Sequence, residues 1–108
     1  MDVTASVARV ESYLTEHADH SVDQLIDLLS IPSVSAQPAH ADDMRRAAEW
    51  VCKQFASAGL ASEIVPTDGY PIVYAEWTAA PNAPTALVYG HYDVQPPDPL
   101  DQWITPPF

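Results

Sequence analysis

The sequence predicts an α/β fold in which helices come first and strands follow, and three observations support this. Apolar residues recur at helical spacing through the chain up to Ala58. After Gly59 the pattern changes to short, partly β-branched runs separated by turns. The connections between these runs are too short to hold a crossover helix, so successive strands should run in opposite directions.

Two helices are expected in the first 30 residues. The first has an apolar stripe with steps of four, three and four residues, made by Val3, Val7, Val10 and Leu14. The second should begin at Ser21, because Gln24 stands three residues later and completes a possible capping box. Pro32 should end it, since the residue before a proline is pushed out of the helical region.

A third helix should begin near Ala41 or Asp42, where acidic residues complement the helix dipole. Gly59 stands where a left-handed C-terminal cap would lie. The residues expected on the buried face of this helix are Met44, Ala47, Ala48, Val51, Phe55 and Ala58.

Three short strands are expected next, over residues 60–65, 72–77 and 85–89. No helix follows the third, and the chain continues as a proline-rich loop to Phe108. Helices that lie only upstream can cover one face of such a sheet but not both. The sequence therefore predicts the N-terminal part of a larger domain, incomplete at 108 residues.

Composition limits the possible functions. Fifteen acidic residues against four basic ones give a net charge of -11, which opposes binding to nucleic acid or to anionic membranes. No apolar run approaches the roughly 20 residues needed to cross a bilayer. The start of the chain lacks the pattern of a secretory signal, and the single cysteine, Cys52, cannot form an internal disulfide. A cytoplasmic protein is expected.

The candidate site is His91 and Asp93, which follow the third expected strand and Gly90. In extended chain, residues two apart project to the same side, so both side chains can face one point. A histidine that binds a metal through one nitrogen usually needs an acceptor for its other N–H, and a carboxylate can supply it. Alternatively, both residues could be ligands, they could be a base and its orienting group, or they could simply staple a loop.

A longer pattern around this pair resembles the zinc-dependent exopeptidase family, which includes carnosine-type dipeptidases, acetylornithine deacetylase and succinyl-diaminopimelate desuccinylase. The resemblance is closest to the dipeptidase branch, and it runs from about the first helix to Phe108. It rests on Leu29-Ser30-Ile31-Pro32-Ser33-Val34-Ser35, Gly90-His91-Tyr92-Asp93-Val94-Gln95-Pro96-Pro97-Asp98-Pro99, Trp103 and Pro106-Pro107-Phe108.

The resemblance implies the N-terminal portion of a mixed-sheet catalytic domain, without the inserted lid and dimerisation domain. It implies two divalent metal ions, zinc in this family, with His91 as a ligand of one and Asp93 holding the His91 ring. A metal-activated water would then cleave the amide bond of a small peptide, and the longer parent protein would be a homodimer. The bridging aspartate, in an Asp-Asp-Lys-Gly context, and the paired glutamates should come after Phe108, so the 108 residues alone are expected to be inactive.

Three other interpretations remain open beside the dipeptidase. One is a related deacylase or desuccinylase, and another is a non-catalytic binding relative that kept the scaffold. The third is an unrelated interaction domain in which His91 and Asp93 are structural.

The remaining candidates favour structural roles. His17 and His20 are one helical turn apart but have polar neighbours, which favours a solvated helix end. His40 is expected in a loop or cap, and Ser33 and Ser35 are expected to be turn hydroxyls, since they lack a Gly-x-Ser-x-Gly elbow. The other residues considered are Cys52 as a packed thiol, Asp98 and Asp101 in an exposed loop, Trp50 and Trp77 in packing, and Trp103 beside the site.

Overall fold

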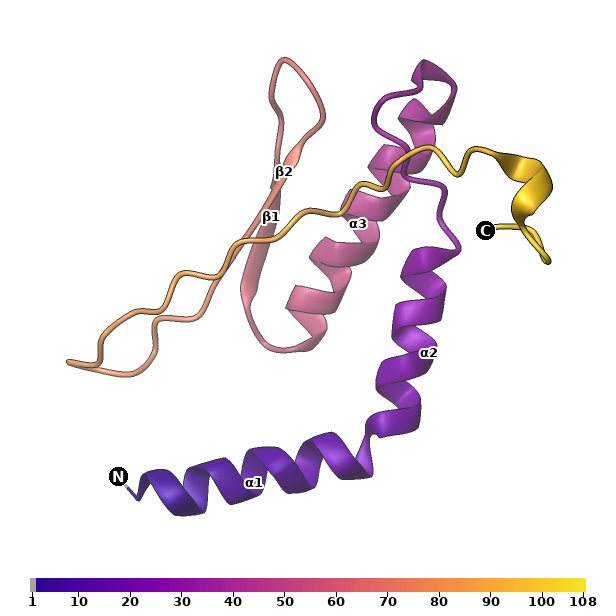
Figure 1. Cartoon of the computed structure of the whole chain (residues 1–108). Helices are drawn as coiled ribbons and strands as arrows, with labels where there is room; N and C mark the ends of the chain where they lie inside the picture. Colours follow the sequence, from indigo (N-terminus) through magenta and orange to yellow (C-terminus); the bar gives the residue numbers. More distant parts are fainter. Residues whose placement is uncertain (1) are drawn as a thin grey trace. The chain divides into compact units, whose positions relative to one another are not determined.

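The computed structural model of the chain describes residues 2–108, which form two compact units, 2–30 and 31–108 (Figure 1). The first unit is entirely helical. The second contains a long helix, a two-stranded sheet and two short 3-10 helices. The described residues therefore combine helices and strands, as an α/β fold requires.

The first unit consists of α1 (Val3–Glu16) and α2 (Ala18–Leu29). α1 begins where Asp2 accepts hydrogen bonds from the backbone N–H groups of Thr4 and Ala5. It ends at His17, whose ring stacks on Tyr13 with 4.0 Å between centroids. The amphipathic pattern predicted the first helix correctly.

The predicted start of the second helix is wrong. α2 begins at Ala18, and Ser21 lies inside the helix, where its backbone N–H donates to the carbonyl of His17 at 2.9 Å. A serine followed three residues later by glutamine also fits a helix interior, so the pair did not fix the boundary. The helix does end before Pro32, as expected.

Neither helix of the first unit buries a residue. Its exposed apolar side chains are those of Val3, Val7, Val10, Tyr13, Leu14, Val22, Leu25, Ile26 and Leu29.

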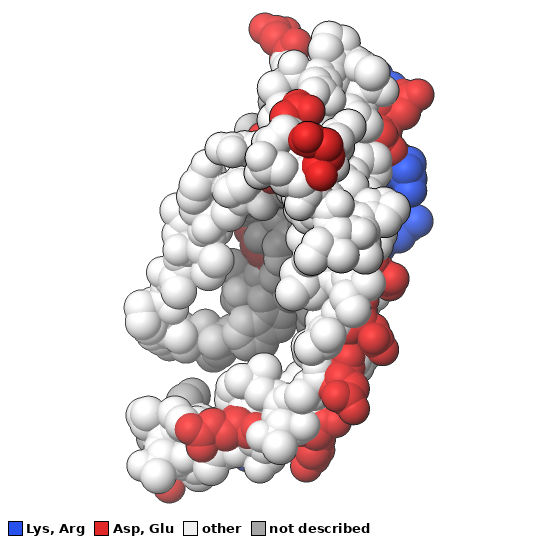
Figure 2. Space-filling view, turned by 45° about the vertical axis from the view of Figure 1, so that its right-hand side comes forward, with Lys and Arg blue, Asp and Glu red and all other residues white. Residues whose placement is uncertain are grey.

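No helix among residues 2–108 is long and apolar enough to cross a membrane. Figure 2 shows acidic side chains spread widely over the face in view and basic ones confined to a few places.

The second unit is organised by α3 (Ala41–Ser57), which follows the 3-10 helix η1 (Pro38–His40). Ala58 caps the helix, and Gly59 follows with a φ of 88°, the left-handed conformation that glycine adopts without steric cost. Both ends agree with the prediction.

The buried face of α3 is shorter than predicted. Met44, Ala47 and Ala48 are buried, and they form a small core with Ile31, Ser33 and Val34. Val51 is partly exposed, Phe55 is 37% exposed and Ala58 is exposed. Val51 and Phe55 lie in the C-terminal half of the helix and Ala58 is its C-cap, so the described chain covers this end less completely.

The sheet is an antiparallel hairpin of β1 (Ala61–Val65) and β2 (Ile72–Glu76), and α3 packs against both strands (Figure 1). Ala61 pairs with Glu76 and Val65 with Ile72. The antiparallel direction confirms the argument from connection length. Each strand is one residue shorter than predicted, and Trp77 is 61% exposed beyond the end of β2.

The predicted third strand, over residues 85–89, does not form, and the only sheet among residues 2–108 has two strands rather than a mixed arrangement. Leu87, Val88 and Tyr89 are 93%, 89% and 91% exposed. A strand needs a neighbour for its backbone N–H and carbonyl groups, and the described chain places none beside this segment. The apolar residues at 85–89 indicated a buried segment, but they did not specify which strand would pair with it.

Candidate metal-binding site

Two segments far apart in the sequence meet at the candidate site: residues 33–35, which follow α2, and residues 91–94. Val34 and Val94 form an isolated parallel bridge, and the Val94 N–H donates to the Ser33 carbonyl at 2.9 Å. Val34 is completely buried. The segment that carries His91 and Asp93 is therefore anchored on the small core of the second unit.

His91 and Asp93 form the contact expected for a supported metal ligand. His91 Nδ1 lies 2.8 Å from Asp93 Oδ1 and 3.1 Å from the Asp93 carbonyl oxygen. Both partners are acceptors, so Nδ1 carries a proton, and in the neutral ring Nε2 is then the nitrogen with the free lone pair. The His91 side chain is 74% exposed, which leaves Nε2 open to solvent. A loop staple would show the same hydrogen bond, so the bond alone does not assign a role.

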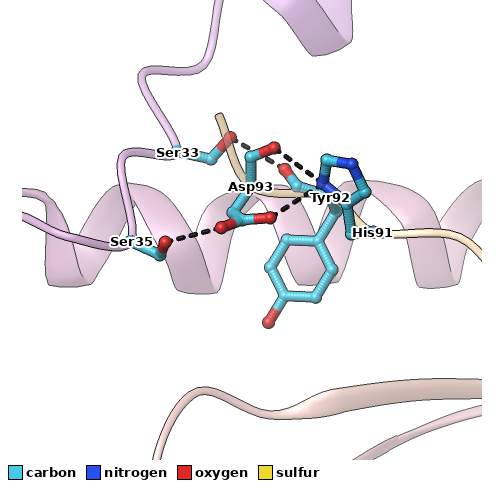
Figure 3. A network of polar contacts seen from close by, with 5 residues as sticks. All are labelled: Ser33, Ser35, His91, Tyr92 and Asp93. Atoms are coloured by element: carbon cyan, nitrogen blue, oxygen red, sulfur yellow. Dashed lines mark hydrogen bonds and ion pairs between the residues drawn. The ribbon is translucent and has the colours of Figure 1, made fainter. Parts of the chain in front are cut away.

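Ser35 holds the other oxygen of the same carboxylate. Its hydroxyl donates to Asp93 Oδ2 at 2.5 Å, on the opposite side of the carboxylate from His91 (Figure 3). The Ser35 hydrogen bond is the main influence that lowers the pKa of Asp93 below its ordinary value, and partial burial opposes it. The His91 hydrogen bond lowers the same pKa further. Asp93 is therefore ionised at neutral pH and can accept from both partners.

Ser33 and Tyr92 fix the backbone between these side chains. The hydroxyl of Ser33, a residue only 1% exposed, donates to the Tyr92 carbonyl at 2.8 Å (Figure 3). The Tyr92 hydroxyl donates to the carbonyl of Pro71, in the β1–β2 connection, at 2.6 Å. Burial is the largest cause of the raised pKa of Tyr92, so this phenol stays protonated and remains a donor.

Sequence reasoning missed the role of the two serines. Ser35 lies in a turn and Ser33 does not, and their hydroxyls bond to residues 58 and 59 positions away, respectively. No local pattern signals contacts at that separation. Only the similarity of the 29–35 segment to a family motif marked these positions.

The described residues do not by themselves form a complete metal site. Residues 2–108 hold no group of three or more His, Cys, Asp or Glu side chains that could bind a metal ion together. The bare Nε2 of His91 suits one coordination position, whereas a zinc ion takes about four ligands. Among the described residues, His91 could therefore supply only part of the ligand set of a zinc ion.

Two of the other histidines, His17 and His40, have local partners. His17 Nδ1 lies 2.8 Å from the Tyr13 carbonyl, in the linker between α1 and α2, and His20 is exposed within α2. His40 lies at the N-terminus of α3, as expected, and its Nδ1 contacts Asp43 Oδ2 at 2.8 Å. These positions agree with structural roles.

In the part of the chain that the structure describes, none of the remaining candidates forms a hydrogen bond with His91 or Asp93. Asp98 and Asp101 are exposed, as predicted, and Cys52 is a partly exposed free thiol. Trp103 donates from Nε1 to the Pro97 carbonyl at 2.7 Å. It lines an open hollow of about 500 Å³ together with Asp98, and His91 is not among the lining residues.

The second unit is thus a small helix-and-hairpin structure in which His91 is an exposed histidine supported by a carboxylate. Comparison with curated proteins defines its relationship more closely. The chain is 31% identical over 95% of its length to the Cys-Gly metallodipeptidase of Schizosaccharomyces pombe and covers 24% of that protein. It is 31% identical to the Beta-Ala-His dipeptidase of Homo sapiens, with 96% of the chain and 23% of the relative covered. It is 33% identical to the Cysteinylglycine-S-conjugate dipeptidase of Corynebacterium striatum, with 87% of the chain and 21% of the relative covered.

The chain is therefore a distant homologue of this dipeptidase family and spans less than a quarter of the length of these relatives. The resemblance found in the sequence is confirmed. No protein-family model matches the chain. No solved structure matches it significantly.

Proposed function

We propose that this chain is part of a longer metal-dependent dipeptidase, to which it supplies His91 as a metal ligand and Asp93 as the residue that orients it. The observation that carries the proposal is the 2.8 Å contact between His91 Nδ1 and Asp93 Oδ1 in a chain homologous to metallodipeptidases. It leaves Nε2 bare and exposed, which is the state a metal-binding imidazole requires.

Asp93 contributes charge as well as geometry. An ionised carboxylate bonded to Nδ1–H selects the tautomer and makes Nε2 a stronger donor to a cation. Divalent metals in such a site lower the pKa of bound water and polarise a carbonyl, which is the chemistry that amide hydrolysis needs. The acidic groups that complete the ligand set and take the proton from water belong to the part of the protein outside these 108 residues.

Dipeptides are the proposed substrates, rather than acylated amino acids. The relatives reported above are all dipeptidases by name, and they include Cys-Gly and Beta-Ala-His enzymes. The exposed run Leu87–Val88–Tyr89 supports a longer parent, because apolar side chains exposed at about 90% gain most from a covering element. Homodimer formation by that parent is a further prediction from the family resemblance.

The test begins with the coding sequence around this chain. It should continue into a protein of several hundred residues that carries further His, Asp and Glu ligands. Purified with zinc, that protein should hydrolyse Cys-Gly or β-Ala-His faster than an N-acetyl amino acid, and a chelator should abolish turnover. The 108-residue chain alone should show no hydrolysis.

His91→Ala in the longer protein should lower the bound zinc, measured by mass spectrometry, and abolish turnover. His20→Ala, which changes an exposed histidine in α2, is the matched control and should leave both unchanged. A coding sequence that stops at Phe108, or full zinc content in His91→Ala, would contradict the proposal.

A further inference from the structure

The carboxylate of Asp93 is held at both of its oxygens, one by His91 and one by Ser35. We infer that Ser35 is a positioning residue for His91: its hydroxyl fixes the Asp93 carboxylate, and the carboxylate in turn fixes the His91 ring. The inference rests on the proposed function for its consequence in metal binding, but its structural part can be tested without a metal.

The first argument concerns rotation of the carboxylate. The last torsion of an aspartate side chain is broad, so one hydrogen bond leaves its plane poorly defined. Two bonds on opposite sides, 2.5 Å to Ser35 Oγ and 2.8 Å to His91 Nδ1, define that plane (Figure 3). Ser35 therefore determines where the oxygen that meets the imidazole lies.

The second argument concerns which partner is fixed. Ser35 directly follows Val34, which is completely buried and bridged to Val94. The His91 side chain, in contrast, is 74% exposed, and no described residue other than Asp93 hydrogen-bonds to its ring nitrogens. The buried core therefore fixes the position of Ser35, Ser35 fixes the Asp93 carboxylate, and the carboxylate fixes the exposed His91 ring.

Ser33 provides an internal comparison. It lies two residues away in the same segment, but its hydroxyl donates to the Tyr92 carbonyl and not to the carboxylate. Loss of the Ser33 hydroxyl removes a backbone tether, whereas loss of the Ser35 hydroxyl releases Asp93. The two substitutions therefore separate general damage to the segment from loss of positioning.

The experiment measures the His91 tautomer by nitrogen-15 NMR in the 108-residue chain, about two pH units above the ordinary imidazole pKa of about 6.5. Wild type should show the Nδ1–H form. Ser35→Ala should shift the ring towards the tautomer mixture of a free imidazole, and Ser35→Thr, which keeps a hydroxyl, should restore the wild-type signal. Ser33→Ala should retain the Nδ1–H form. If Ser35→Ala does not fold, Ser35→Cys, a weak donor of similar size, gives the same comparison.

In the longer protein, Ser35→Ala should weaken zinc affinity about tenfold, as loss of a group behind a metal ligand typically does, with rescue by Ser35→Thr. An unchanged tautomer in Ser35→Ala, or an equal shift in Ser33→Ala, would overturn the positioning role. A tautomer shift in Ser35→Ala together with full zinc content in His91→Ala would retain the positioning role and refute the proposed function.

Discussion

The hydroxyl of Tyr92 donates to the carbonyl of Pro71 at 2.6 Å, across 21 positions of sequence. This bond ties the connection between β1 and β2 to the residue that stands between His91 and Asp93. The hairpin and the segment 33–35 thus hold the His91–Asp93 segment from two sides, one through a side chain and one through backbone and serine hydroxyls.

Tyr92→Phe should therefore destabilise the second unit. The substitution removes the donor and leaves the Pro71 carbonyl without it, which should lower the free energy of unfolding by about 1 kcal/mol. Urea unfolding of the 108-residue chain, followed by tryptophan fluorescence, measures the change. Tyr89→Phe is the matched control, because Tyr89 is 91% exposed, and it should unfold as wild type does. Equal stability of the two variants would argue against a structural role for the Tyr92 bond.

Met44→Ala should be more damaging. Met44 is 2% exposed and belongs to the small core beneath α3, so its truncation loses buried apolar area and leaves a cavity. Substitutions of this kind cost about 2–5 kcal/mol, which is a large share of the stability of a small domain. Loss of cooperative thermal unfolding, monitored by circular dichroism, is the expected result. Leu87→Ala, at a side chain 93% exposed, should leave the unfolding curve unchanged. A Met44→Ala curve that also matches wild type would show that this core contributes little.

Acid should weaken the start of α3 through Asp43. This carboxylate contacts His40 Nδ1 at 2.8 Å and Arg46 at 2.7 Å, and its pKa is lowered, chiefly by the His40 hydrogen bond. A lowered pKa means that the folded chain binds the proton less readily than the unfolded chain. The stabilisation is therefore present above the ordinary pKa of 3.8 and is lost as the pH falls through the lowered value.

Asp43→Asn should reduce this acid dependence, measured as the unfolding free energy at a series of pH values below 5. Asp42→Asn is the matched control, since Asp42 lies in the same turn with a side chain that is 91% exposed. It should follow the wild-type curve. An Asp43→Asn variant with the wild-type acid dependence would rule out this carboxylate as the source.

The elements that sequence predicted well depend on local patterns. The stripe of α1, the glycine that ends α3 and the short turn between β1 and β2 are each encoded within a few residues. The contact between His91 and Asp93 is also local, because an extended chain brings residues two apart to one side. Their metal and catalytic roles remain predictions.

The features that the sequence did not predict depend on contacts between residues far apart in the chain. The bonds of Ser33 and Ser35 cross more than 50 positions, and no periodicity reports them. The run at 85–89 has the composition of a buried strand, but a strand is defined by its neighbour, and the described chain offers none. The start of α2 was misplaced because Ser21 and Gln24 suit a helix interior as well as a helix cap.

The bare run at 87–89 also has a consequence for the isolated polypeptide. Leu87, Val88 and Tyr89 form a short apolar stretch without charge or proline. No strand of the described chain pairs with the backbone of this stretch. Such a stretch offers a template onto which an identical segment from another molecule can add. This stretch should therefore lower the concentration at which the 108 residues remain dispersed, despite the repulsion from a net charge of -11.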